Sequence, residues 1–227
     1  MAVAFDAVST DNNLDVSHTA SGSDRVALAF VGWLTNGTRT VDDCDYGTDQ
    51  MTELFDDSRV ISGSLRIGLS LWYLLDPPTS AETVTATLSS SATRSCIAVV
   101  TYTGVDSIGA SGSNDGNSSA PSVTFTTDDS GNLVVVASHV RGGDADPQTH
   151  PTGSNERWDT ATGTFANVDI AYAGADDDST GSSQTFTWTA AVSDHWLSQG
   201  VELVAAGGGP ATAIKDIIGG GIIPAPR

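Results

Sequence analysis

Apolar and polar residues alternate with a period of two along most of this chain, and this alternation limits its fold more than any other feature. In SLRIGLSLWYLL, Leu65, Ile67 and Leu69 point to one face, while Arg66 and Gly68 point to the other. ETVTATLSS and SQTFTWTA repeat the pattern with threonines on the polar face. A period of two is typical of antiparallel strands that have one buried and one solvated face.

Two further runs, RVALAFVGWL and GNLVVVASHV, are apolar on both faces and are expected to be central strands. Clusters of Gly, Asn, Asp, Ser and Pro separate the runs about every ten residues, which predicts roughly a dozen strands and no long helix. The longest such cluster, residues 109–121, is expected to be a mobile surface loop, and no internal repeat is evident. The pattern favours an all-β fold, a two-sheet antiparallel jelly-roll sandwich with a C-terminal extension.

The composition changes near residue 207, which divides the chain into a jelly-roll domain (residues 2–206) and a tail (residues 207–227). The tail begins with GGGP, a linker signature. Residues 211–218 have helical spacing of apolar side chains, whereas residues 222–227, IIPAPR, are expected to be extended. The apolar residues of the tail are Ile214, Ile217, Ile218, Ile222, Ile223 and Pro224.

The chain is strongly acidic, with 28 Asp and Glu against nine Lys and Arg and a formal net charge of −19. Such a charge argues against binding to nucleic acid and against an anionic membrane surface. Four of the acids are Glu and the only lysine is Lys215. Because molar salt screens self-repulsion, this composition indicates adaptation to high salt. An ordinary acidic extracellular domain is the alternative.

No run of 18 apolar residues is present, and the first ten residues lack the features of a signal peptide. Insertion into a membrane is therefore not expected. Two cysteines, Cys44 and Cys96, allow at most one internal disulfide. A pair of buried free thiols is an equal alternative.

Four stretches resemble, in their order along the chain, concanavalin-like jelly-roll domains of tailed-virus structural and fibre proteins and of some bacterial surface proteins. One departure is Thr48, which follows Gly47 where that pattern has a second glycine. The resemblance covers most of residues 2–205 and none of the tail. The stretches are YGTDQMTELF (46–55), SLWYLLDPPTSAETVTATLSS (70–90), AVVTYTGVDSIGA (98–110) and SQTFTWT (183–189).

Together with the acidic composition, the resemblance implies a non-enzymatic structural virion protein from a virus of a halophilic archaeon. It would be a capsid decoration, turret or tail-fibre component on the virion surface, assembled in the host cytoplasm without a signal peptide. The tail would attach it to other virion proteins of the capsid or tail, and a homo-oligomer is expected. Burial of the isoleucines would stabilise such a contact, but it only offsets the entropy cost of ordering the tail. Net binding would also require the tail backbone to pair with a strand edge.

Enzymatic activity is not expected, although jelly rolls of this shape include glucanases and polysaccharide lyases. The E-x-D-x-x-E run of the related glucanases is absent, and the lyase site needs a lysine that only the tail supplies. The four histidines lie in scattered segments without a nucleophile-elbow motif. They are His18, His139, His150 and His195. A polysaccharide-active enzyme remains the second alternative.

Two weaker binding hypotheses remain. Asp43, Asp45 and Asp49 surround a glycine turn and offer the oxygen ligands that Ca²⁺ prefers, although solvated turn carboxylates are the favoured explanation in a chain so rich in Asp. No other cofactor is implied. Trp158, in NERWDT, is the candidate for an exposed aromatic that contacts a host surface glycan. It supports the first alternative function, a glycan- or receptor-binding adhesion module on the virion or cell surface.

Overall fold

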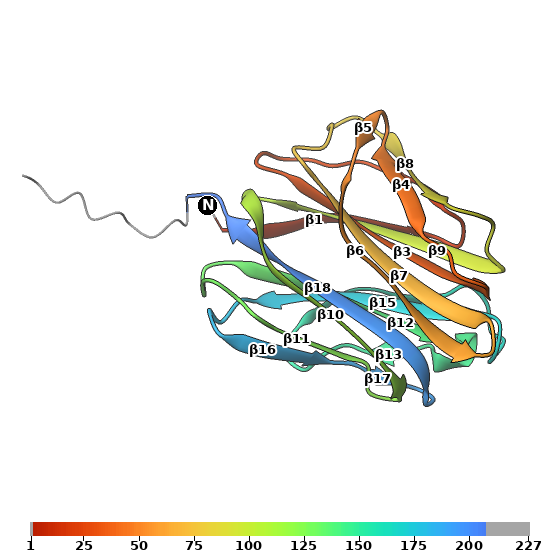
Figure 1. Ribbon diagram of the computed structural model, residues 1–227. Coiled ribbons are helices and arrows are strands. Elements are labelled where there is room, and N and C mark those ends of the chain that lie inside the picture. Colours follow the sequence, from red (N-terminus) through yellow and green to blue (C-terminus); the bar gives the residue numbers. More distant parts are fainter. Residues whose placement is uncertain (1, 208–227) are drawn as a thin grey trace, which may run out of the picture.

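Two five-stranded antiparallel sheets lie face to face at the centre of the molecule (Figure 1). The structure is a computed structural model that describes residues 2–207. The first inner sheet has the order β1 (Ala4–Asp11), β9 (Arg94–Thr103), β3 (Val26–Asn36), β7 (Leu65–Leu75), β6 (Thr52–Ser62). The second has the order β10 (Val105–Ser118), β18 (Asp194–Ala205), β12 (Leu133–Arg141), β15 (Ile170–Asp178), β14 (Asn155–Ala161).

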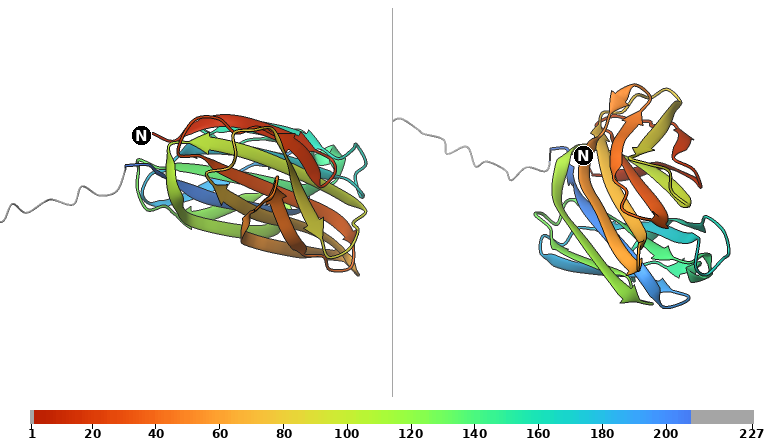
Figure 2. Two further views of the ribbon diagram at one scale, coloured as in Figure 1. Left: turned by 90° about the horizontal axis from the view of Figure 1, so that it is seen from above. Right: turned by 45° about the vertical axis from the view of Figure 1, so that its right-hand side comes forward.

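Smaller sheets cover the outer face of each inner sheet, so the molecule has four layers (Figure 2). On the first half the outer sheet is β2 (Asp15–His18), β8 (Glu82–Leu88), β4 (Val41–Tyr46), β5 (Asp49–Gln50). On the second half β11 (Ser122–Thr126) pairs with β16 (Ser183–Thr187), and β13 (Gln148–Thr149) pairs with β17 (Thr189–Ala190). A short 3-10 helix, η1 (Gly143–Ala145), precedes β13.

Each half of the chain winds through its two layers in the same way. Only Met51 separates β5 from β6, and only Trp188 separates β16 from β17, so each pair counts as one continuous strand. Each half then has eight strands. The first, eighth, third and sixth lie together in the inner sheet, and the second, seventh and fourth in the outer layer. This is the winding of a jelly roll, and it occurs twice in succession.

The strand registers show that the repetition extends to single residues. A β-bulge interrupts β6 between Glu53 and Phe55, and another interrupts β14 between Glu156 and Trp158. Asp56 and Asp159 follow these bulges directly. The sequences ELFD and ERWD therefore occupy equivalent positions in the two halves. No repeat was evident from the sequence, because little more than this four-residue pattern is shared.

Both faces of the central strands are buried, as their sequences predict. In β3, Phe30 points into the large core between the inner sheets, whereas Trp33 points into the core beneath the first outer sheet. In β12, Val135 and Val136 divide in the same way between the central core and the core beneath β11 and β16. Double-sided burial explains why these two runs lack alternation.

The prediction of a mobile loop at residues 109–121 is wrong, because most of this segment belongs to β10, which pairs with β18. Its residues are small because large rings lie over them. A Cβ atom on Gly116 would come within 2.3 Å of Trp196, and one on Gly112 within 3.0 Å of Phe125. β10 therefore lacks the alternating large side chains by which a strand is recognised in a sequence, because rings from neighbouring strands fill that space.

The all-β antiparallel sandwich expected from the sequence is confirmed, with the refinement that the jelly-roll winding is present twice. Within residues 2–207 no helix is long and apolar enough to cross a membrane. The predicted anchor residues of the tail, from Ile214 to Pro224, lie outside the described residues.

Candidate functional site

Trp158 is not available for glycan contact, so that prediction is wrong. Its side chain is 6% exposed and packs in the central core, with its ring 5.5 Å from that of Phe30. Gly174 makes room for it, since a Cβ atom there would come within 2.0 Å of the indole. The polar residues around Trp158 in the sequence belong to β14, which lies at the edge of the second inner sheet.

Cys44 and Cys96 are both free and buried, which excludes the disulfide and confirms the alternative of two free thiols. Cys96 points into the central core, and Cys44 lies beneath the first outer sheet, where its sulfur is 3.5 Å from that of Met51. The two thiols are thus on opposite faces of one inner sheet. Burial raises the pKa of the Cys44 thiol to about 12, so it carries no charge at neutral pH.

The proposed calcium ligands lie at the outer edge of the first jelly roll. Asp43 accepts a hydrogen bond from Gln50 at 3.0 Å, and burial followed by the neighbouring Asp43 raises the pKa of Asp45. Asp49 is paired in the strand ladder with Tyr46. Among residues 2–207 no group of three or more acidic, histidine or cysteine side chains is arranged to hold a metal ion.

The most deeply buried carboxylates join strands to one another. Asp176 in β15 accepts hydrogen bonds from Arg157 at 2.5 and 2.9 Å and from the Tyr102 hydroxyl at 2.8 Å. Tyr102 belongs to the first half and Asp176 to the second, so this group connects the two jelly rolls. With its acceptor positions filled, Asp176 has a structural role.

Asp159 is the strongest candidate for acid–base chemistry. Burial, followed by the nearby carboxyl group of Asp146, raises its pKa to about 7. A pair of carboxyl groups that shares a proton near neutral pH is a known catalytic arrangement. Neither residue lines a described pocket, however, and Asp159 Oδ2 accepts the backbone N–H of Gln148 at 3.0 Å. The geometry favours a structural role for Asp159, which connects β14 to β13.

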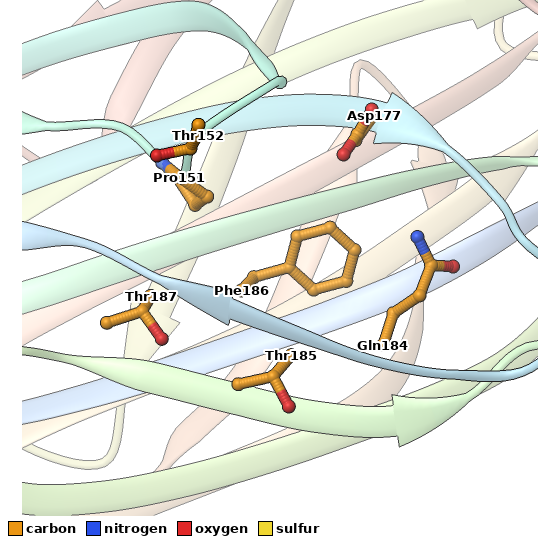
Figure 3. Close-up of a pocket in the computed structure, with 7 residues that line it drawn as sticks. All are labelled: Pro151, Thr152, Asp177, Gln184, Thr185, Phe186 and Thr187. Atoms are coloured by element: carbon orange, nitrogen blue, oxygen red, sulfur yellow. The ribbon is translucent and has the colours of Figure 1, made fainter.

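A pocket of about 270 Å³ lies on the outside of the second jelly roll (Figure 3). Asp177 and Gln184 stand at one end of it, and Pro151 and Thr152 at the other. Thr185, Phe186 and Thr187 of β16 form its wall. Burial, followed by Asp178 and Asp176, raises the pKa of Asp177. The pocket therefore combines strand backbone, an aromatic ring and a half-buried acid.

Sequence reasoning missed this pocket. The alternation in SQTFTWT places Thr185 and Thr187 on an outward face, as observed. A strand would lie beside Thr185 and Thr187 only if β13, which pairs with β17, continued further, but β13 has only two residues. The sequence does not indicate where β13 ends. The one sequence signal was Pro151, which follows β13 closely and cannot donate to a strand ladder.

The fold defines this chain as an all-β antiparallel sandwich made of two successive jelly rolls. Comparison of the chain with protein-family models, with curated proteins and with solved structures gave no match.

Proposed function

We propose that this chain is a non-enzymatic structural protein of a virus particle. It projects from the particle surface as a capsid decoration, turret or tail-fibre component and is attached through residues 207–227. The observation that carries the proposal is the pair of jelly rolls joined over one continuous buried core. Jelly rolls recur in viral capsid proteins and in lectins, so the fold alone does not distinguish these roles, and the proposal rests on particular residues.

The polar interior supports a structural role over an enzymatic one. Asp176, Asp169 and Glu202 each accept several hydrogen bonds from neighbouring strands and loops. The burial of Trp158 removes the residue on which the glycan-binding alternative depended. What remains is a rigid body with a polar exterior, which suits display on a particle.

The charge distribution supports attachment through the tail and a halophilic host. Residues 208–227 contain Lys215, Arg227 and a single acid, Asp216, whereas the remainder of the chain holds 27 of the 28 acids. The tail is thus the one cationic and Ile-rich segment of an acidic protein. At molar salt the self-repulsion of the acidic body is screened.

Incorporation into particles tests the proposal. The gene for the chain ending at residue 207 would replace the intact gene in the virus, and gradient-purified particles would be examined by quantitative mass spectrometry. We expect the intact chain in particles at a fixed copy number and the shortened chain only in the host lysate. Equal incorporation of both chains would refute attachment through the tail, and absence of the intact chain from particles would refute the virion role.

A further inference from the structure

Among residues 2–207 no strand lies beside the edge of β16 that faces away from β11. The N–H of Trp188 bonds to the carbonyl of Pro121 at 2.9 Å, which fixes the alternation of this ladder. The backbone groups of Thr185 and Thr187 therefore point to the opposite edge. Within the described residues β11 is the only strand paired with β16. This open edge forms the wall of the pocket in Figure 3.

The first jelly roll shows what normally fills this position. There β4 pairs with β8, so that Asp45 lies opposite Thr85, and the N–H of Gly47 bonds to the carbonyl of Thr83 at 2.9 Å. Thr83 and Thr85 are equivalent to Thr185 and Thr187, because Val84 and Phe186 hold the same place opposite the second strand of each half. One half thus carries a strand where the other has a pocket.

We propose that this pocket accepts residues 222–227 of a second copy of this chain as an added antiparallel strand. The inference rests on the proposed function, because it names the surface that receives the tail. The register follows that of β4 in the first half, with Ile223 opposite Thr187 and Ala225 opposite Thr185. Main-chain hydrogen bonds then supply affinity, as in other cases of strand addition.

The sequence of residues 222–227 suits this role in three ways. In this register Ile222, Pro224 and Pro226 face inward, against the ring of Phe186, as Cys44 and Tyr46 face inward in the first half. The N–H groups of Ile223 and Ala225 face β16. Pro224 and Pro226 have no N–H to present at the new outer edge, so the sheet does not grow further.

Charge and length agree with the same placement. Arg227 comes to the end of the pocket at which Asp177 lies, and among the described residues Asp177 has no cationic partner. Residues 208–221 provide a connection of at most about 46–50 Å when extended, enough to reach a neighbouring molecule. A ring or a row of copies joined from tail to pocket follows from one acceptor and one donor per chain.

Binding of a labelled synthetic peptide of residues 219–227 tests the pocket. The acceptor is the full-length protein carrying Ile223→Pro, whose own tail cannot donate toward β16. We expect an added Thr187→Pro to weaken peptide binding about tenfold or more, because it removes one donor from the open edge. Thr187→Ala, which keeps that donor, should change binding less than twofold. Proline is tolerated at such an edge, since the pairing with β11 is untouched.

Two peptide variants keep the test independent of protein folding. Ile223→Pro in the peptide removes a donor that faces β16 and should abolish binding. Ile222→Pro removes a donor on the other edge and should have little effect. Equal binding of these two peptides, or of the Thr187→Pro and Thr187→Ala proteins, would overturn the proposed pocket.

Mixing two defective proteins tests whether the donor is a second copy. Full-length Thr187→Pro retains a donor tail, and full-length Ile223→Pro retains an acceptor pocket. We expect each to be monomeric by sedimentation velocity and their mixture to form a one-to-one dimer. A mixture that stays monomeric would overturn exchange between copies. Particle incorporation of Thr187→Pro chains at wild-type level would overturn this pocket yet leave the proposed virion role intact, so the two failures are distinguishable.

Discussion

Asp56 of the first jelly roll and Asp159 of the second occupy equivalent positions and make the same hydrogen bond. Asp56 Oδ2 accepts the N–H of Val41 at 3.2 Å, and Asp159 Oδ2 accepts the N–H of Gln148 at 3.0 Å. Val41 and Gln148 are the first residues of the fourth strand in each half. The acid thus ties the edge of each inner sheet to the outer layer in both halves, although most of the surrounding sequence differs between them.

The carboxyl groups of Asp56 and Asp159 should make the stability of the fold depend on pH. Burial raises the pKa of Asp56 to about 6 and that of Asp159 to about 7, from an ordinary value of 3.8. Between about pH 4 and pH 7 the folded protein therefore holds protons that the unfolded chain has lost. Burial lowers the pKa of His139 to about 3, which acts in the opposite direction, so the expected fall with rising pH is in the difference in free energy of unfolding between the wild type and variants that remove these carboxyl charges. Urea denaturation at constant salt measures it.

Asp159→Asn keeps an acceptor oxygen and removes the charge. We expect this variant to exceed the wild type by about 1 kcal/mol in free energy of unfolding at pH 8, a value reduced for solvent screening at a half-buried site. No gain is expected at pH 4, where the wild-type carboxyl is protonated. The exposed Asp106→Asn is the control. A stability gain of equal size at both pH values would show that the carboxyl does not titrate in this window.

Glu202 should be a stabilising carboxylate with the opposite pH dependence. It accepts hydrogen bonds from the N–H of Asp128 at 2.9 Å and from the Asn132 amide at 2.8 Å, and these bonds lower its pKa although burial acts to raise it. Glu202→Gln should cost about 2 kcal/mol near pH 7. The cost should shrink as the pH falls through the lowered pKa of Glu202. A cost that is constant from pH 7 to pH 3 would contradict this role.

In the first half, an acid from a different strand accepts the equivalent hydrogen bond from a loop N–H group. Asp6 of β1 accepts the N–H of Ser21 at 2.8 Å, the bond equivalent to that between Asp128 and Glu202 of β18. We expect Asp6→Asn to destabilise the protein less than Glu202→Gln, because Asp6 is more exposed. Parallel urea denaturation of the two variants at pH 7 measures the difference.

The small residues of β10 should resist enlargement. Gly116→Val places a side chain where the ring of Trp196 lies and should reduce the free energy of unfolding by about 1–3 kcal/mol. Gly131→Ala is the matched control, since its nearest neighbour would be an ordinary 3.6 Å away. If residues 109–118 formed a loop, the two variants would be equally stable.

The net charge predicts that salt stabilises the fold. At −19, repulsion among carboxylates should lower the free energy of unfolding in dilute buffer, and sodium chloride at molar concentration should restore it. The midpoint of urea denaturation, measured between about 0.1 and 3 M salt, should rise steadily. A midpoint that does not change with salt would contradict the expected adaptation to high salt.

Sequence patterning predicted the strands that have one wet face. In β8 and β16 the alternation is complete, because solvent lies on one side, whereas β7 also alternates in sequence but is buried on both faces from Ile67 to Trp72. It did not predict β10, whose glycines accommodate rings from other strands, or the burial of Trp158, whose polar sequence neighbours conceal an inward position. Alternation reports the environment of one strand and not the partners that lie across it.

The repeat and the pocket could not be predicted for a related reason. Both halves keep their winding while Val84 and Ala86 of one outer sheet correspond to Phe186 and Trp188 of the other. In the first half β4 has six residues, whereas its counterpart β13 has only two. The gap beside Thr187 therefore depends on how the layers pack against each other. No local pattern in the sequence predicts it.

Disulfide trapping tests the central claim, that the tail of one copy pairs with β16 of another. Chains carrying Thr185→Cys and differently tagged chains carrying Ala225→Cys would be mixed and oxidised, since the native thiols are buried and do not compete. The proposed register predicts a covalent heterodimer, and it predicts none when Thr124→Cys, one strand further from the edge, replaces Thr185→Cys. Equal yields from the two pairs, or no heterodimer from either, would contradict the account.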